Sequence, residues 1–201
     1  RVRSSAASDV YKRQMSICGN YMKQKGTLKK NTIVATVMSN LGMFLMGERE
    51  GIHIEKTKVG DRYVLENMLE NGYNIGGEQS GHIIFLDENT TGDGLLSALH
   101  LLQVMTETKK KLSELASIME VLPQALVNAK VPNHKKEHFE EYAEIAEAIA
   151  EVEAKFAGEG RVLIRPSGTE PLVRVMIEGK DQQLIESEAQ KLAELISSIM
   201  L

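Results

Sequence analysis

The chain has 201 residues, of which 42% are hydrophobic and 26% are charged, and its net charge at pH 7 is −4. This balance is ordinary for a globular protein. The negative charge excludes a general nucleic-acid binder, so any anion site must be a local cluster. The single cysteine, Cys18, excludes a disulfide framework and favours a reducing compartment, which predicts a cytoplasmic protein. No apolar run approaches the ~18 residues of a membrane span.

Residues 1–14 differ in composition from the rest of the chain. The stretch is basic and serine-rich and has no apolar periodicity. It lacks the apolar core of about 7–15 residues that a signal peptide needs, although its composition agrees with a transit peptide. A different pattern opens at Met15. We therefore expect residues 1–14 to be a non-native or disordered leader that stands outside the fold.

Alternating strand and helix patterns predict an α/β domain over residues 15–106. The near-continuous apolar run at 32–38 is typical of a strand buried on both faces. Asp61 and Asp93 each precede an apolar helical pattern and are expected to cap a helix. The expected helices lie at 15–25, 41–46, 61–71 and from 93 onward, and the expected strands at 32–38, 53–58, 73–75 and 82–86. We expect a mixed sheet between layers of helices.

A second, smaller domain is predicted over residues 123–201. Residues 107–122 begin with a polar, lysine-rich stretch and are expected to be a linker. The pattern that follows predicts strands at 125–131, 161–164 and 173–177 and helices at 137–152 and 181–199. Each helix carries one apolar stripe. Two amphipathic helices on one face of a small sheet give an α+β domain of about 80 residues, near the lower limit for independent folding.

The turn between the last two expected strands reads Arg-Pro-Ser-Gly-Thr-Glu-Pro-Leu-Val-Arg over residues 165–174. Arg165 and Arg174 supply guanidinium groups that match a phosphate dianion. Ser167 and Thr169 supply hydroxyl donors, and Gly168 lets backbone N–H groups approach an anion closely. The alternative is a surface hairpin with scattered charges, but its donors would then point at water. The turn therefore predicts a phosphate site.

A second polar cluster lies at residues 76–82, between two short expected strands. Its glycines permit a tight loop, and inside the loop stand Glu78, Gln79, Ser80 and His82. A carboxylate, an amide, a hydroxyl and an imidazole suit the vicinal hydroxyls of a sugar. A glycine-rich hairpin with incidental polar side chains remains the alternative.

A third cluster lies at residues 56–62, where an expected strand passes into a helix. Ligands usually bind at this edge of an α/β sheet, so Lys58 and Arg62 could reach a phosphate or sugar there. Alternatively, Asp61 simply caps the helix and the two basic residues are surface charges. No acidic cluster at short spacing predicts a Mg²⁺ site, and no nucleophilic serine motif is present.

These three segments, in this order, resemble the α-D-phosphohexomutase family, and most closely its bacterial phosphoglucosamine mutase branch. The matching stretches are 58–62 (KVGDR), 77–82 (GEQSGH) and 165–174 (RPSGTEPLVR). Family proteins have four domains around a cleft, and residues from about 15 onward look like the third and fourth. The resemblance implies that Glu78 and Ser80 hold sugar hydroxyls and that Gln79 distinguishes this branch from the phosphomannomutase/phosphoglucomutase relatives. It further implies that the non-transferring phosphate is held by Arg165, Ser167, Gly168, Thr169 and Arg174, with Lys58, Arg62 and His82 near the reacting end.

The resemblance also implies a reaction. A complete enzyme of this branch converts glucosamine 6-phosphate to glucosamine 1-phosphate, using a phosphoserine, Mg²⁺ and a bisphosphate intermediate. The phosphoserine and metal loops belong to the family's first two domains, so we expect them to lie outside this chain and the chain alone to be inactive. A truncated gene record is favoured over a natural half-protein. A phosphomannomutase or phosphoglucomutase fragment, and a non-catalytic sugar-phosphate binding module, remain alternatives, and a homodimer remains open.

Overall fold

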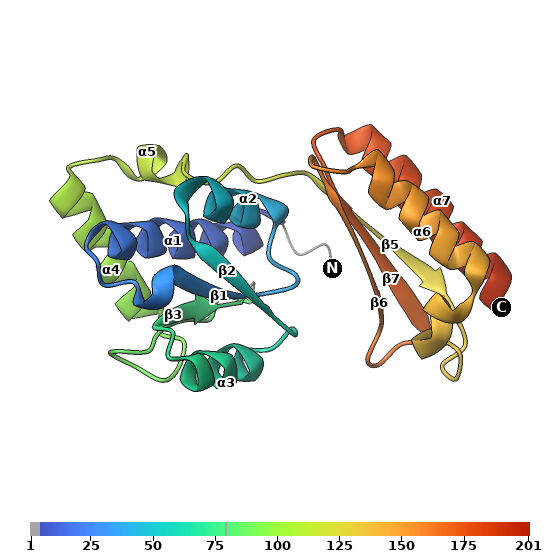
Figure 1. Cartoon of the computed structure of the whole chain (residues 1–201), viewed down its shortest axis with the longest axis horizontal. Coiled ribbons are helices and arrows are strands. Elements are labelled where there is room, and N and C mark those ends of the chain that lie inside the picture. The colour runs from blue at the N-terminus through green and yellow to red at the C-terminus, as the bar shows by residue number, and fades with distance from the viewer. Residues whose placement is uncertain (1–4, 79) are drawn as a thin grey trace. The chain divides into compact units, whose positions relative to one another are not determined.

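The computed structural model describes residues 5–78 and 80–201, with side chains from residue 11 onward. The chain divides into two compact units, with the boundary between Val121 and Leu122. Figure 1 shows the first unit in blue to yellow-green and the second in yellow to red. Within the described residues, no helix has the length and apolarity needed to cross a membrane.

The first unit is built on a four-stranded mixed sheet of order β2-β1-β3-β4. Strand β1 pairs in parallel with β2 and with β3, whereas β4 pairs antiparallel to β3. The strands are β1 (Thr32–Thr36), β2 (His53–Thr57), β3 (Ile75–Gly77) and β4 (Ile83–Phe85). The mixed sheet expected from the sequence is thereby confirmed.

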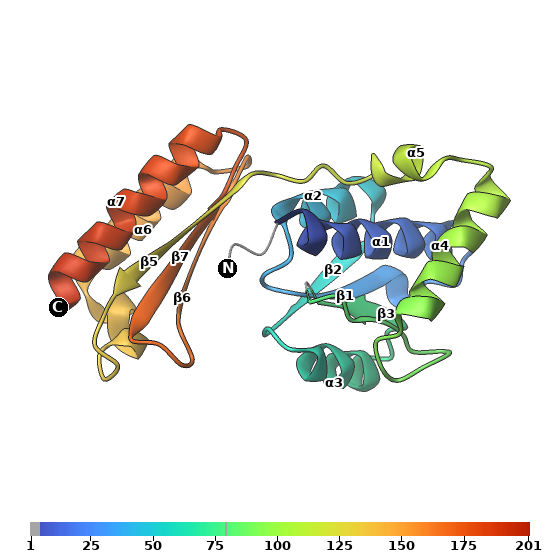
Figure 2. The ribbon, with the colours of Figure 1, turned by 180° about the vertical axis from the view of Figure 1, so that it is seen from behind.

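Helices cover both faces of this sheet. Ile33 and Ala35 of β1 join one buried cluster with residues of α1 and α2, whereas Val34 joins a second cluster with Val64 and Met68 of α3. Figure 2 shows α3 on the face opposite to α1 and α2. The helices are α1 (Ser5–Gln24), α2 (Leu41–Glu50), α3 (Asp61–Asn71), α4 (Gly94–Thr108) and α5 (Leu112–Ala116). Strand β1 is therefore buried on both sides, as its continuous apolar run predicts.

The N-terminal segment differs from the expected disordered leader. Helix α1 begins at Ser5, ten residues before the expected start at Met15. Lys12 is buried, and its carbonyl accepts a hydrogen bond of 2.9 Å from Ser16 Oγ. The ring of Tyr11 packs directly on Gly81. Helix α1 therefore extends into the polar stretch, whose lack of apolar periodicity concealed it, and its described side chains pack from Tyr11 onward; residues 1–4 lie outside the described part.

The expected linker at residues 107–122 is also packed. Met119 is buried in the same cluster as Ile33 and Met43. A Cβ on Gly42 would lie 1.7 Å from the carbonyl oxygen of Glu120, so the start of α2 fits closely against this segment. Helix α5 and residues up to Val121 therefore belong to the first unit.

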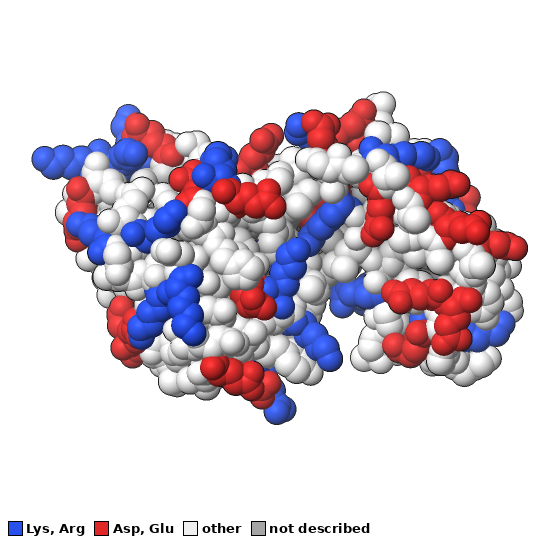
Figure 3. Space-filling model, in the orientation of Figure 1, with Lys and Arg blue, Asp and Glu red and all other residues white. Residues whose placement is uncertain are grey.

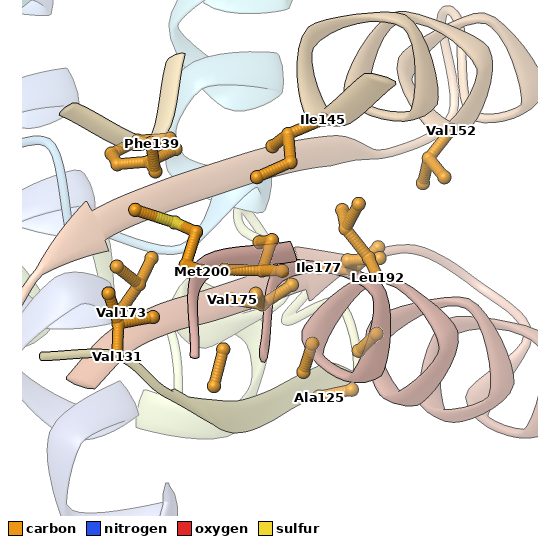
Figure 4. Packing of buried hydrophobic residues seen from close by; sticks show 14 of the residues in the cluster. Ala125, Val131, Phe139, Ile145, Val152, Val173, Val175, Ile177, Leu192 and Met200 are labelled. Atoms are coloured by element: carbon orange, nitrogen blue, oxygen red, sulfur yellow. The ribbon is translucent and has the colours of Figure 1, made fainter. Parts of the chain in front are cut away.

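The second unit is a three-stranded antiparallel sheet of order β5-β7-β6 with two helices on one face. Figure 4 shows Val173, Val175 and Ile177 of β7 in the core between sheet and helices, with Ile177 close to Leu192. The elements are β5 (Gln124–Lys130), η2 (Lys136–Glu141), α6 (Ala143–Lys155), β6 (Arg161–Pro166), β7 (Leu172–Glu178) and α7 (Gln182–Met200). The α+β class is as expected.

The helix expected at 137–152 is broken. Tyr142 has φ −85° and ψ 113°, an extended conformation that ends the 3₁₀ segment η2 and precedes α6. Phe139 of η2 is buried in the core, whereas Ile145 reaches the same core from α6. Phe139 and Ile145 thus reach one core from two separate segments on either side of Tyr142.

Candidate functional site

The parallel strands of the first unit bring three loops to one edge of the sheet. Strands β1, β2 and β3 run in the same direction, so their carboxyl ends lie at the same edge. The loops that follow them contain residues 37–40, 58–60 and 78–82. This edge is the usual ligand edge of an α/β sheet. The sequence pointed to the second and third loops through their charged groups, whereas the first carries none.

The loop at 78–82 holds its polar side chains together. The Ser80 hydroxyl donates a hydrogen bond to Glu78 Oε1, and Ser80 Oγ lies 3.0 Å from His82 Nδ1. His82 Nδ1 lies 3.7 Å from the same Glu78 oxygen. The Glu78 side chain is 11% exposed and that of His82 is 50% exposed, so the group opens to solvent on one side. Such a set can exchange its internal hydrogen bonds for those of a polyol. Gln79 lies outside the described residues.

Glycines fix the shape of this loop. A Cβ on Gly77 would lie 2.4 Å from the His82 carbonyl oxygen, and one on Gly92 would lie 2.9 Å from the His82 side chain. Gly81 has φ +106°, a conformation that favours glycine, and it packs on Tyr11. The position of His82 is therefore set by close backbone packing on several sides.

Lys58 and Arg62 lie at the same edge of the sheet, but their described contacts do not include residues of the 78–82 loop. Lys58 is exposed. Within the described residues, Arg62 pairs through Nε with Glu66 at 2.7 Å, and this hydrogen bond raises the pKa of Arg62. Asp61 does not cap α3 as expected, because Gly60 with φ +137° takes that position and the Asp61 carboxylate accepts from the Arg62 N–H at 2.8 Å.

In the second unit, Arg165 and Arg174 are direct partners in the register of β6 and β7. Side chains directly opposite each other lie on the same face of a sheet, so two positive charges stand next to one another. The Arg165 side chain makes no hydrogen bond or ion pair with the described residues. Burial, and secondly the charge of Arg174, lower the pKa of Arg165. Arg174 Nη2 lies 3.0 Å from Glu170 Oε2, and both side chains are partly exposed. Such an exposed pair is worth ~0–1 kcal/mol.

The loop between these strands presents its remaining donors outward. Ser167 is buried, and its N–H donates to the Leu172 carbonyl at 2.9 Å. Its hydroxyl oxygen accepts from the Glu170 N–H at 3.2 Å. Gly168 and Thr169 are exposed, and a Cβ on Gly168 would meet nothing within 4 Å. The loop therefore joins an anchored serine to an open glycine beside two guanidinium groups, an arrangement that can bind an oxyanion.

Two further residues, one beside Arg174 in the sheet and one in contact with the loop, carried no signal in the sequence. Asn128 of β5 is the register partner of Arg174 and extends the Arg165–Arg174 row across the sheet. Lys136 is buried, and its ammonium group donates to the carbonyl oxygens of Ser167 and Glu170. A lysine within a lysine- and histidine-rich stretch reads as a solvated charge, and only the fold shows it beneath the loop.

The charge of this site is local, as the net charge of the chain requires. Figure 3 shows acidic side chains gathered over the helices of the second unit. Helix α6 contributes exposed carboxylates from four positions, which are Glu144, Glu147, Glu151 and Glu153. The helix face therefore repels anions, whereas the open face of the sheet carries the arginine row. Across the described residues, no group of three His, Cys, Asp or Glu side chains is placed to hold a metal ion.

The family models for phosphoglucomutase/phosphomannomutase match most of the chain. The alpha/beta/alpha domain III model matches residues 12–122, and the C-terminal domain model matches residues 126–195. The chain belongs to this family. The domain III match begins within α1, which agrees with the packing of that helix, and it extends through the segment expected to be a linker. The family resemblance stated from the sequence motifs is thereby confirmed.

Curated relatives in this family share high identity with the chain. It is 63% identical over 182 residues to the phosphoglucosamine mutase of Ruminiclostridium cellulolyticum and 64% identical over 182 residues to that of Acetivibrio thermocellus. Each match covers 90% of this chain and 40% of the relative. The chain therefore spans about two fifths of the length of these relatives.

Solved structures of the family share the fold at low identity. N-acetylphosphoglucosamine mutase from Aspergillus fumigatus matches with a TM-score of 0.74 and 16% identity, over 94% of this chain and 43% of that one. An N-acetylglucosamine-phosphate mutase in its substrate complex matches with a TM-score of 0.68 and 22% identity, over 92% of this chain and 43% of that one. The family fold is retained despite this divergence.

Proposed function

We propose that the chain supplies the third and fourth domains of a phosphoglucosamine mutase, an isomerase that interconverts glucosamine 6-phosphate and glucosamine 1-phosphate. The names and 63–64% identity of the bacterial relatives support this assignment. The activity is proposed for a complete protein, because the chain spans 40% of those relatives. Its product would feed UDP-N-acetylglucosamine and peptidoglycan precursor synthesis, in the cytoplasm.

The register pairing of Arg165 with Arg174 carries this proposal. Two like charges on facing positions of a hairpin destabilise it, and a bound dianion removes that repulsion. We assign to these two arginines, with Ser167, Gly168 and Thr169, the binding of the substrate's non-transferring phosphate. Among the described residues, the Arg165 guanidinium group has no hydrogen-bond or ion-pair partner, whereas that of Arg174 would have to exchange Glu170 for the phosphate.

We assign the sugar hydroxyls to Glu78 and Ser80. Their mutual hydrogen bond and the nearby His82 form a preorganised donor–acceptor set at the ligand edge of the first unit. Gln79 is proposed to select the sugar, and Lys58 and Arg62, as exposed cations near this edge, are proposed to act near the reacting end.

A complete enzyme of this kind also needs a phosphoryl donor and a metal. A phosphoserine, Mg²⁺ and a hexose bisphosphate intermediate are proposed to belong to the complete protein. One relative, the Aspergillus fumigatus enzyme, was crystallised with GlcNAc-6P and magnesium. Because the described residues offer no cluster of metal ligands, the residues of this chain are assigned to binding and orientation alone.

A chimera tests the proposal. The matched 182 residues of the Ruminiclostridium cellulolyticum enzyme are replaced by those of this chain, and turnover is measured with glucosamine, glucose and mannose 6-phosphates. We expect the chimera to prefer glucosamine 6-phosphate, and Glu78→Ala to lower its turnover more than Glu88→Ala, a control outside the loop. A preference for mannose or glucose phosphate would instead support the phosphomannomutase/phosphoglucomutase alternative.

The 201-residue chain alone provides a second test. We expect it to bind a sugar phosphate weakly and to show no mutase turnover, because the described residues supply neither a metal cluster nor an exposed serine nucleophile in the phosphate loop. Measurable turnover by the purified chain would contradict this division of roles. Inactivity of the chimera together with phosphate binding by the chain would support a non-catalytic binding module.

A further inference from the structure

Lys136 is the buried cation closest to the loop at 166–171. It begins η2, and its backbone N–H donates to the Pro132 carbonyl at 3.1 Å. The residue is 8% exposed, and its ammonium group donates to the Ser167 carbonyl and, at 3.3 Å, to the Glu170 carbonyl. Within the described residues, no carboxylate lies at ion-pair distance from it. Burial of an ammonium group that is held by carbonyl oxygens alone is unfavourable in free energy. The charge of Lys136 is therefore expected to serve the loop that it contacts.

The contact with Ser167 determines which way the next amide points. The C=O of one residue and the N–H of the following residue point in opposite directions across a trans peptide bond, and no described peptide bond is cis. A Ser167 carbonyl directed at Lys136 therefore directs the Gly168 N–H away from Lys136. Gly168 has open space on its side-chain face, since an added Cβ would meet nothing within 4 Å.

The second contact anchors the other end of the same turn. The Glu170 carbonyl accepts from Lys136 and also from the Leu172 N–H at 2.9 Å. The Glu170 N–H is in turn used within the loop, by Ser167 Oγ at 3.2 Å. One ammonium group thus holds the Ser167 and Glu170 carbonyls at the two ends of the turn. The Gly168 N–H between them points away from Lys136.

We propose that Lys136 is a positioning residue for the phosphate site, which aims the Gly168 amide at the bound anion by holding the Ser167 and Glu170 carbonyls. It acts through the loop and does not touch the phosphate. The inference rests on the proposed phosphate site. It adds to that site a residue outside the arginine-containing turn, 31 positions earlier in the chain.

The neighbouring lysine provides a matched control. Lys135 Nζ donates to the Met200 carbonyl at 2.9 Å, so it ties η2 to the end of α7 and has no described contact with the loop. Lys135→Met and Lys136→Met remove the same charge from adjacent positions. A role limited to folding would affect thermal stability in both variants, but only the proposed role would change phosphate binding selectively.

The experiment is an NMR titration of the ¹⁵N-labelled 201-residue chain with inorganic phosphate. In the wild type, we expect the Gly168 amide to shift markedly on saturation. Lys136→Met is expected to weaken phosphate binding at least tenfold and to reduce the Gly168 shift, whereas Lys135→Met changes the dissociation constant less than twofold. Lys136→Arg, which keeps the charge and the donors, is expected to recover part of the affinity.

The outcomes separate the inference from the function beneath it. A wild-type chain that binds no phosphate overturns the proposed phosphate site, and the inference with it. Phosphate binding that is normal in the wild type and unchanged in Lys136→Met overturns the inference alone. If Lys136→Met does not fold, the wild-type chain and Lys136→Arg decide. The inference is overturned if phosphate does not shift the Gly168 amide signal of the wild-type chain. It is also overturned if Lys136→Arg has an altered Gly168 amide signal and still binds phosphate with full affinity.

Discussion

Replacing Arg165 with methionine should weaken phosphate binding and stabilise the second unit at the same time. Arg165 faces Arg174 in register and has no partner among the described residues, so its charge serves no structural contact. Removing one charge-assisted contact to a phosphate costs about 1.5–3 kcal/mol, which corresponds to roughly a 10- to 150-fold higher dissociation constant. Without ligand, removal of the like-charge pair should stabilise the hairpin by about 0.2–1 kcal/mol. For a unit of this size, that gain would raise the melting temperature by roughly 1–8 °C.

Two assays on the same protein measure these opposite effects. Isothermal titration calorimetry with glucosamine 6-phosphate gives the affinity, and thermal unfolding in phosphate-free buffer gives the stability. Lys180→Met is the matched control, because it removes one positive charge beyond the other end of β7, where Lys180 pairs with an exposed Glu159. The control should leave the affinity within twofold of the wild type. Wild-type affinity in Arg165→Met, or a lower melting temperature in that variant, would refute the reasoning.

Three further outcomes are expected. Glu170→Gln frees Arg174 from an exposed ion pair worth at most about 1 kcal/mol, so calorimetry should show phosphate binding up to about fivefold tighter, and weaker binding would contradict this. Glu178→Gln removes a fully buried carboxylate that lies 2.7 Å from Arg161, so urea unfolding should show a loss of about 3–5 kcal/mol; a loss below 1 kcal/mol would contradict this expectation. Burial raises the pKa of the Cys18 thiol to about 12, so the reactive thiolate is suppressed at pH 8 and a thiol reagent should label the chain only after unfolding, whereas rapid labelling of the folded chain would argue against the packing of α1.

Local chemistry was enough to predict much of the fold. The apolar run at 32–38 marked a strand buried on both faces, and β1 packs against two separate clusters. Asp93 caps α4 by accepting from the N–H groups of Leu95 and Leu96, as its position before an apolar pattern predicted. These features depend on residues close together in the chain, so the sequence carries them directly.

Other features depend on contacts between distant residues. The break at Tyr142 separates Phe139 and Ile145, which pack into one core with residues far along the chain, and the apolar periodicity of the sequence does not mark it. Helix α1 begins in a polar stretch, and its Tyr11 packs on Gly81, a glycine seventy positions later. No local pattern reports such contacts.

The candidate site divides in the same way. The donors of the 165–174 turn were readable from residue types, and the register of β6 with β7 then placed the two arginines side by side. Asn128 and Lys136 come from other segments: only the sheet pairing places Asn128 beside Arg174, and only the path of η2 brings Lys136 to the loop. Spacing in the sequence therefore identified the turn but not the residues that support it.

The most direct test of the phosphate site is a crystal structure of the chain grown with glucosamine 6-phosphate. We expect the phosphate oxygens to lie about 2.7–2.9 Å from guanidinium nitrogens of both Arg165 and Arg174, with the Gly168 amide as a further donor. A phosphate bound elsewhere on the chain, or an Arg165 guanidinium turned away from a phosphate held at this loop, would contradict the account.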